Sequence, residues 1–299
     1  WEYLAASATN LPDNSIHNPA LGSDPQINYG FGSSAMASAF ARGNYNYNDK
    51  YYATYTFRYD GSSNFGPLNR WAPFHSFAAS WRFTNEDFMQ SMNDIFSNGK
   101  LRLGWGQTGN QNIGGYAWGA SISKMETGLG LGYRQSNIAN PYVQWETQEQ
   151  FNIGLDLSLF NNRIDLTVDA YDKVSRNMLM QMQLPSYMGT RGNGSSALAA
   201  PQGNFGTIDN KGLEFSITSH NMKGQGLNWD TELQISFNKN TLVALDGTDA
   251  AYLEGYGQWS DVVSRTQVGE SLYGYYGYKV AGIYTDLADI KSWSTKDLD

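Results

Sequence analysis

Few residues in this chain have the types and spacing that catalysis or metal binding requires. The three histidines, His17, His75 and His220, lie too far apart in the sequence to form a metal-ligand motif, and the chain contains no cysteine. A Gly-x-Ser-x-Gly nucleophile elbow and a phosphate-binding P-loop are both absent from the sequence. Asp165 and Asp169 share one face of a predicted strand, but four strand residues separate them by roughly 13 Å, too far for a pair of glycosidase carboxylates. We therefore expect neither enzymatic activity nor a cofactor.

Charged side chains are instead spread along the predicted strands, where they alternate with apolar ones. Both signs of charge occur on this polar side, so we expect it to line a water-filled interior or to hold a domain that plugs that interior. The residues predicted to face the interior are Arg58, Asp60, Arg82, Arg102, Asp156, Asp165, Asp169, Glu214, Asp230 and Glu232.

The strands that position these residues are predicted from period-two alternation. In residues 51–60, one face carries Tyr, Ala, Tyr, Phe and Tyr, while the other carries mainly hydroxyl and charged side chains. Residues 151–159 and 164–171 repeat the pattern on either side of Asn161-Asn162, a dipeptide that tolerates the positive φ of a tight turn. These two segments predict a β-hairpin.

Alternation is the same in a soluble sandwich and in a membrane barrel, because the apolar face meets a core in one and lipid in the other. Segments of about ten residues match a tilted bilayer crossing, whereas soluble strands usually have about five or six residues. Short connectors, such as those at residues 48–49 and 223–226, alternate with long ones over residues 106–145 and 184–210. Short turns at one rim and long loops at the other are typical of outer-membrane barrels. The sequence thus favours an all-β, antiparallel, up-and-down transmembrane β-barrel.

Residues 85–98 interrupt the strand pattern. Phe88, Met92 and Phe96 recur every four residues, which predicts a short amphipathic helix in a connector on the short-turn side. Aromatic rings with a polar edge are also expected at the membrane surfaces. The residues predicted to lie in these aromatic girdles are Tyr51, Trp145 and Trp229.

The long connectors are rich in Gly, Asn, Ser and Gln, and loops of this kind often carry recognition. Aromatic side chains can stack on sugar rings, and Arg can bind the carboxylates of peptides. The loop residues predicted to contact a ligand are Tyr116, Trp118, Tyr133, Arg134, Tyr187 and Arg191.

Composition excludes two further classes of protein. No apolar run of about 18 residues occurs in the chain, which excludes a transmembrane helix. The net charge of -8 over 299 residues argues against nucleic acid as a partner, because phosphate binding needs a basic surface.

Several segments resemble, in the same order, the conserved segments of SusC/RagA-type TonB-linked outer-membrane proteins of Bacteroidota. They lie within about residues 30 to 285 of the chain. They read NYNDKY at 46–51 (with Tyr45 before them, YNYNDKY), RYDGSSNF at 58–65, KLRLGWGQTGNQ at 100–111, NPYVQWE at 140–146, DAYDK at 169–173, NKGLE at 210–214, and VGES at 268–271 followed by GIY at 282–284.

The resemblance implies a plugged barrel of about 22 strands in the outer membrane. It implies active uptake of oligosaccharides or peptides, driven by the TonB–ExbB–ExbD complex, with a SusD-like lipoprotein as a lid. Residues 1–299 are then expected to be the middle portion of the barrel and to contain roughly ten of its strands. The plug domain, the TonB box and the closing strands are expected to lie outside this sequence.

Two alternatives remain at this point. The first is a siderophore-type TonB-dependent receptor without a lipoprotein lid. The second is a secreted β-sandwich that acts as an adhesin or a carbohydrate-binding module, in which the apolar faces would pack against each other.

Overall fold

The computed structural model describes residues 2–9, 23–31, 33–182, 184, 186–189, 197–222, 226–245, 252–258, 261–280 and 283. The chain divides into two units, Trp1–Lys239 and Asn240–Asp299. Nearly all of the described secondary structure is β-strand, in agreement with the predicted all-β class. No helix in the described part of the chain is long and apolar enough to cross a bilayer.

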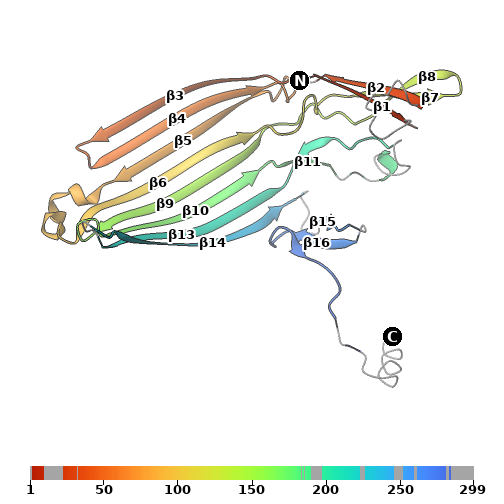
Figure 1. Cartoon of the computed structure of the whole chain (residues 1–299). Coiled ribbons are helices and arrows are strands. Elements are labelled where there is room, and N and C mark those ends of the chain that lie inside the picture. The colour runs from red at the N-terminus through yellow and green to blue at the C-terminus, as the bar shows by residue number, and fades with distance from the viewer. Residues whose placement is uncertain are drawn as a thin grey trace. The chain divides into compact units, whose positions relative to one another are not determined.

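The main element is an eight-stranded sheet with the strand order β14-β13-β10-β9-β6-β5-β4-β3 (Figure 1). Neighbours from β3 to β13 pair antiparallel, so the sheet is an up-and-down meander, as predicted. Its strands are β3 (Met36–Tyr47), β4 (Tyr51–Ser62), β5 (Trp71–Trp81), β6 (Phe96–Asn110), β9 (Glu146–Leu159), β10 (Ile164–Arg176), β13 (Thr207–Met222) and β14 (Trp229–Ala244).

Smaller sheets complete the strand set. They are the pairs β1 (Glu2–Thr9) with β2 (Ser23–Phe31), β7 (Ile122–Thr127) with β8 (Gly130–Gln135), and β11 (Leu179–Gln181) with β12 (Gln202–Asn204), and in the second unit the three strands β15 (Tyr252–Tyr256), β16 (Val262–Gln267) and β17 (Gly274–Tyr275). The pairs β7–β8 and β11–β12 lie within the two long connectors of the main sheet. Added strands in long connectors leave the simple order of the main sheet unchanged.

Short and long connectors alternate along the main sheet, as predicted. The β3–β4 turn holds Asn48 and Asp49 at φ of 51° and 52°, and the β9–β10 turn holds Asn161 and Asn162 at 58° and 60°. Asn and Asp adopt this left-handed conformation more readily than most residues. The β3–β4 and β9–β10 turns lie at one end of the sheet, together with the longer β5–β6 connector, and the connectors that hold β7–β8 and β11–β12 lie at the other end (Figure 1).

The predicted amphipathic helix over residues 85–98 is wrong. The β5–β6 connector holds two 3-10 helices, η2 (Phe83–Asn85) and η3 (Asp87–Met92). Met89 is buried, whereas Phe88 and Met92 are exposed. A helix this short gains little from its own hydrogen bonds, so contacts with the ends of the neighbouring strands decide its form.

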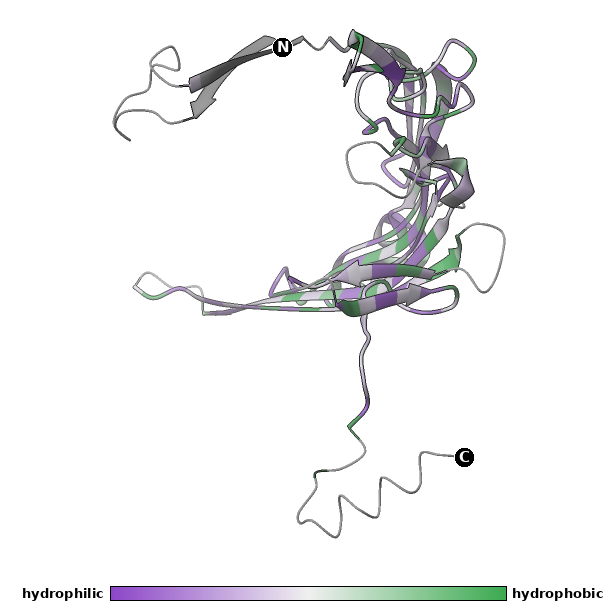
Figure 2. Cartoon of the chain, turned by 90° about the vertical axis from the view of Figure 1, so that its right-hand side faces the viewer, coloured by the Kyte–Doolittle hydropathy of each residue, from purple (hydrophilic) through white to green (hydrophobic). Residues whose placement is uncertain are grey.

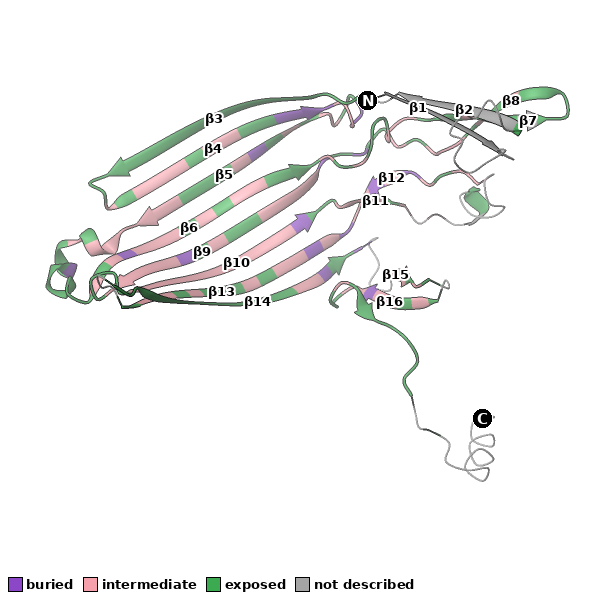
Figure 3. Cartoon of the chain, viewed as in Figure 1, coloured by how far each residue is buried: buried purple, intermediate pink, exposed green. Residues whose placement is uncertain are grey.

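The apolar side chains of the main sheet lie in rows across the strands. Leu101, Leu155 and Val168 are direct neighbours in register, and so are Leu103, Ile153 and Ala170. Many members of this face are open to the surroundings; the exposed ones include Tyr55, Phe77, Leu103, Phe151, Ile153, Leu213, Phe215, Leu233, Ile235 and Phe237. Figure 2 shows hydrophobic and hydrophilic segments alternating along the strands of this curved sheet, and Figure 3 shows exposed positions along most of its strands, whereas β10 is mainly intermediate. Within the described residues, no second sheet covers the apolar face.

In the described part of the chain, a cluster of buried apolar residues lies at the long-connector end of the sheet. It consists of Phe65, Phe74, Val143 and Trp145, each at most 4 % exposed. The indole N–H of Trp145 donates to the carbonyl of Arg70 at 3.1 Å. The prediction that Trp145 belongs to a lipid-facing girdle is therefore wrong, because its ring packs against Phe65 and Phe74 instead.

Candidate functional site: the polar wall of the sheet

Four strands place one row of residues across the polar face of the sheet. Arg102 on β6 pairs with Gly154 on β9, Gly154 pairs with Asp169 on β10, and Asp169 pairs with Glu214 on β13. Gly154 carries no side chain, so the Arg102 guanidinium extends over it towards Asp169. A Cβ atom at Gly154 would lie 2.6 Å from Cζ of Arg102, which shows how closely the guanidinium passes.

Arg102 joins two carboxylates on two different strands. Its Nε and Nη2 donate to Asp156 at 2.7 and 3.0 Å, and Nη2 also donates to Asp169 at 3.0 Å. The two-point contact with Asp156 fixes the plane of the guanidinium. The hydroxyl of Thr167 donates to Asp156 at 3.3 Å. Among the described residues, Oδ1 of Asp169 is buried next to Gly154 and has no hydrogen-bond partner.

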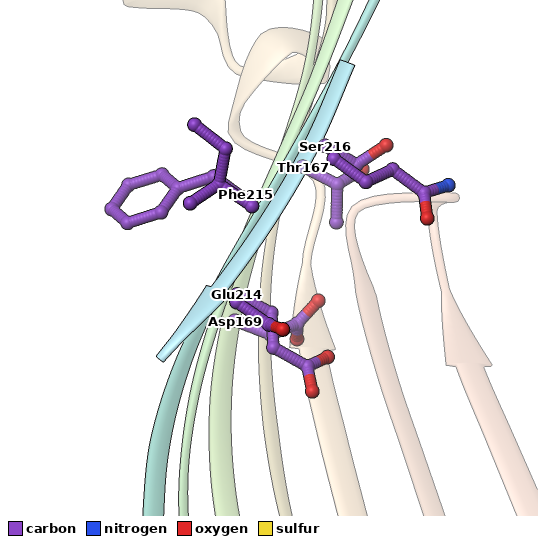
Figure 4. A pocket seen from close by; sticks show the side chains of 8 residues that line it. Thr167, Asp169, Glu214, Phe215 and Ser216 are labelled. Carbon is purple, nitrogen blue, oxygen red and sulfur yellow. The ribbon is translucent and has the colours of Figure 1, made fainter. Parts of the chain in front are cut away.

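The row borders two adjoining hollows. In Figure 4, Thr167, Asp169, Glu214 and Ser216 point to one side of the sheet, and Phe215 points to the other. The hollow drawn there has a volume of about 490 Å³. A second hollow, of about 520 Å³, is lined by Arg102, Asp169 and Glu214 together with Gln150, Asn152, Tyr171, Lys173, Asn210 and Asn238. Amides, hydroxyls and both signs of charge can bind the polar groups of a ligand or of a protein segment, but they do not form a catalytic set.

Comparison with known proteins identifies the sheet. The profile of the family described as "TonB dependent receptor-like, beta-barrel" matches residues 2–297. The chain belongs to this family. Its members are receptors and transporters of the outer membrane rather than enzymes.

Curated relatives carry the same family name. The TonB-dependent receptor P3 of Formosa agariphila is 37% identical over 257 residues, which cover 83% of this chain and 25% of the relative. The TonB-dependent receptor SusC of Bacteroides thetaiotaomicron is 33% identical over 238 residues, which cover 77% of this chain and 23% of SusC. The chain thus spans about a quarter of the length of these relatives.

Solved structures agree with this assignment. The RagAB peptide importer in its closed-closed state superposes with a TM-score of 0.78 at 25% identity, covering 95% of this chain and 31% of that chain. The resemblance to SusC/RagA-type proteins is therefore confirmed. The eight-stranded sheet is part of the wall of a TonB-dependent receptor barrel.

In this barrel wall, only part of the predicted interior set comes together. The row contains Arg102, Asp169 and Glu214, and Asp156 lies beside it as an ion-pair partner of Arg102. Three further pairs or groups lie apart from the row: Arg58 with Asp60 at 2.8 Å, Asp165 and Asp230 on either side of His220 at 3.5 and 2.6 Å, and Glu232 with Gln234 at 2.6 Å. The Arg82 guanidinium lies 5.8 Å from the centre of the Tyr52 ring. These groups join neighbouring strands or residues of one strand.

The uncharged residues of the hollows were not predicted as site residues. The second hollow is lined by Asn152, Tyr171 and Asn210, and Gly154 leaves room for the Arg102 guanidinium to pass. The alternation already places Asn152 and Gly154 on the same face as Asp156. Selecting only the charged residues of the polar face misses these positions, whereas selecting every residue that alternation places on that face includes them.

The predicted ligand residues of the loops lie in separate segments. Tyr116 is exposed in the β6–β7 connector, and Trp118 packs against the Phe65 core. Tyr133 is exposed on β8 beside Arg134, while Tyr187 is exposed in η4 (Ser186–Met188). Arg191 lies outside the described residues. Since Trp118 contributes to a core, its indole is less available to a ligand than the tyrosine rings are.

The short-turn rim of the barrel wall has its own polar centre at Glu86, in the β5–β6 connector. This carboxylate accepts hydrogen bonds from the Tyr51 hydroxyl at 2.6 Å, the Lys50 amine at 2.9 Å and the Trp81 indole at 3.1 Å. The hydrogen bonds from Tyr51, then Lys50 and Trp81, favour the charged carboxylate and lower the pKa of Glu86 to about 2. Glu86 therefore fixes two aromatic rings, Tyr51 and Trp81, at this rim.

Proposed function

We propose that this chain forms part of the barrel of a TonB-dependent importer that carries oligosaccharides or peptides across the outer membrane. In this proposal the residues form the middle of the barrel wall, and a plug domain and further strands are supplied by the rest of the protein. Import proceeds by binding and gated passage, without covalent chemistry. The TonB–ExbB–ExbD complex supplies the energy, and a SusD-like lipoprotein closes the outer face.

The observation that carries the proposal is the difference between the two faces of the eight-stranded sheet. One face is apolar and exposed, as a surface in contact with lipid should be, and the other holds the Arg102 row and its hollows. A soluble sandwich would bury the apolar face against a second sheet. The RagAB importer supports the substrate class by analogy, since it is a peptide importer whose structure superposes on this chain.

Within this function, the polar wall has the role of a binding surface. Asp169 and Glu214 offer carboxylate oxygens to a basic or hydroxyl-rich partner, which is either the plug domain or the passing substrate. The exposed rings of Tyr116, Tyr133 and Tyr187 contact the substrate earlier, at the long connectors.

Uptake by intact cells tests the importer. Cells carrying the full-length receptor should take up a labelled oligopeptide or oligosaccharide library, and deletion of the receptor or of TonB should abolish this uptake. The double variant Asp169→Asn/Glu214→Gln should reduce uptake about tenfold while leaving receptor abundance in the outer membrane unchanged. Arg163→Gln, in the β9–β10 turn away from the row, is the matched control and should have no effect. Uptake that persists without TonB would refute the proposal.

Purification tests the lid. The full-length receptor extracted in mild detergent should carry a surface lipoprotein in a one-to-one complex. A receptor that purifies alone and binds ferric siderophores would favour the siderophore-type alternative instead.

A further inference from the structure

The apolar face of the sheet has a constant length on strands that are far apart. On β4 it runs from Tyr51 to Tyr59, on β9 from Leu159 to Phe151, and on β14 from Trp229 to Phe237. Each of these spans is about 27 Å long at ~3.4 Å per residue. Within the band, the outward positions of these strands carry no charged side chain.

The band is displaced along the strands in a regular way. Residues that pair across neighbouring strands form a line perpendicular to the strands. Such a line starts at Tyr51, the short-turn end of the band on β4, and passes through Trp81 and Leu101. It reaches β9 at Leu155, the middle of the band on that strand. The line from Phe151, at the other end of the band on β9, passes through Trp105 and Phe77 and reaches the middle of the band on β4 at Tyr55. Both ends of the band therefore shift by the same four residues between β4 and β9.

This shift gives the tilt of the strands. Four residues correspond to about 13 Å along the strand, and the three strand steps from β4 to β9 correspond to about 14 Å across the sheet. The strands are therefore tilted by about 43° from the normal of the band, within the range of strand tilts in membrane barrels. Its height is then about 20 Å, close to that of the apolar belt of an outer-membrane barrel. The edges of the band therefore run parallel to the plane of a membrane crossed by tilted strands, and they do not follow the strand register.

Charged side chains begin at the next outward position beyond the band, at the long-connector end. On β13 Lys211 follows Leu213, on β14 Lys239 follows Phe237, and on β9 Glu149 follows Phe151. The Lys211 amine lies 3.2 Å from Asp172 and 2.9 Å from Asp209.

Two further features complete this charged row. On β10 the first charged outward residue is Asp172, the register partner of Lys211, and Arg176 lies two outward positions further towards the long connector. Nε of Arg176 lies 3.6 Å from Glu149, and both Arg176 and Lys211 have more than half of the side chain exposed. Lys239 is exposed, and no ion pair among the described residues includes it. The carboxylates thus hold Lys211 and Arg176 beside the strands, and the exposed part of each side chain is open to a further partner.

From this geometry we infer that Arg176, Lys211 and Lys239 bind the phosphate groups of outer-leaflet lipids. The inference rests on the proposed function, because it requires the long connectors to lie outside the cell. Lys and Arg extend apolar stems along the upper edge of the band and place their charged ends at the level of the headgroups. Amine and guanidinium groups are the protein groups that bind phosphate best. The row therefore fixes the depth of the barrel in the outer leaflet and retains phosphorylated lipid against it.

Spin labels test the position of the boundary. Residues 1–299 contain no cysteine. Single cysteines can therefore be introduced at positions 155, 213, 211 and 209 of the full-length receptor once any cysteine elsewhere in it has been replaced, and the variants can be reconstituted in vesicles and labelled with a nitroxide. Accessibility to oxygen should be greatest at 155 and should fall across 213, 211 and 209, while accessibility to a water-soluble nickel chelate should rise in the same order. A label at 155 that is accessible only to the nickel chelate would overturn both the inference and the proposed function.

Lipid binding tests the row itself. The full-length receptor in nanodiscs should retain added lipid A with two phosphates, measured by native mass spectrometry, and should retain dephosphorylated lipid A weakly. Neutralising Arg176, Lys211 or Lys239 with Gln should lower the affinity about fivefold for each residue. The matched control is Lys173→Gln, next to Asp172 but on the polar face, which should leave the affinity unchanged. Equal retention by the triple variant and the wild type, with label 155 in lipid, would overturn this inference and leave the importer intact.

Discussion

The two faces of the eight-stranded sheet share one backbone and one register, yet their side chains are satisfied in different ways. On the apolar face, residues such as Ile153 and Phe215 lie beside similar residues of the next strands and remain exposed. On the polar face, Arg102 reaches over a glycine and joins Asp156 to Asp169 across three strands. The apolar face therefore has exposed side chains, which lipid covers in the proposed function, whereas the charged side chains of the polar face pair largely with one another.

This difference shows which contacts specify the barrel wall. The apolar face needs only to remain apolar within its band, so it tolerates exchange among apolar residues. The polar face depends on particular ion pairs, because a half-buried carboxylate that loses its guanidinium partner destabilises the fold. The faces should respond in opposite ways to a change of charge.

The largest effect is expected from a charge in the middle of the apolar band. Leu155→Arg should lower the free energy of unfolding by about 2–4 kcal/mol, because Leu155 lies midway between Leu159 and Phe151. Guanidinium titration of the full-length receptor folded in vesicles measures this change. Gln150→Arg, on the polar face of the same strand, is the control and should cost under about 1 kcal/mol. Similar losses in the two variants would show that both faces meet water.

Much of this architecture was predictable from the sequence. Alternation, the turn residues Asn161-Asn162 and the lengths of connectors predict the antiparallel meander and its two unlike rims, and the structure confirms them. These features are local, since neighbouring residues determine both the period and the turn. The family resemblance adds the identity of the barrel, which alternation alone leaves open between a barrel and a sandwich.

The rest depends on contacts between segments that are distant in the sequence. Trp is a residue type typical of aromatic girdles, but the connector before β9 places Trp145 against Phe65 and Phe74. No local sequence pattern indicates that contact. The Arg102 row likewise requires the register of β6, β9 and β10. Once that register is known, Gly154 becomes a functional position, although a glycine in a strand has little meaning by itself.

A smaller effect should follow from removing the centre of the polar row. Arg102→Gln should lower the free energy of unfolding by about 1–2 kcal/mol, because it leaves Asp156 and Asp169 as neighbouring unpaired carboxylates in a part-buried setting. The same vesicle titration measures the change. The triple variant Arg102→Gln/Asp156→Asn/Asp169→Asn should recover part of the loss, since it also removes the repulsion between the carboxylates. A triple variant less stable than Arg102→Gln would contradict this account of the row.

The smallest effect at neutral pH, and the most specific one, concerns the short-turn rim where the two faces meet. The pKa of Glu86 is about 2 in the folded protein, below its ordinary value of 4.5, because Tyr51, Lys50 and Trp81 donate hydrogen bonds to the carboxylate. A lowered pKa stabilises the fold above pH 4.5, and this stabilisation is lost as the pH falls from about 4.5 to about 2. Glu86→Gln should therefore be less stable than the wild type at pH 7 and should approach it at pH 2.

The midpoint of guanidinium unfolding between pH 2 and pH 7 measures this convergence, with Asp94→Asn in the same connector as the control. Asp94 takes no part in the Glu86 hydrogen bonds, so the difference between Asp94→Asn and the wild type should not follow the titration of Glu86. If the difference between Glu86→Gln and the wild type stayed constant from pH 7 to pH 2, the hydrogen bonds at this rim would not depend on the charge of Glu86. The rim would then be held by the packing of Trp81 against Phe83 and Phe88, in the manner of the apolar face and not of the polar one.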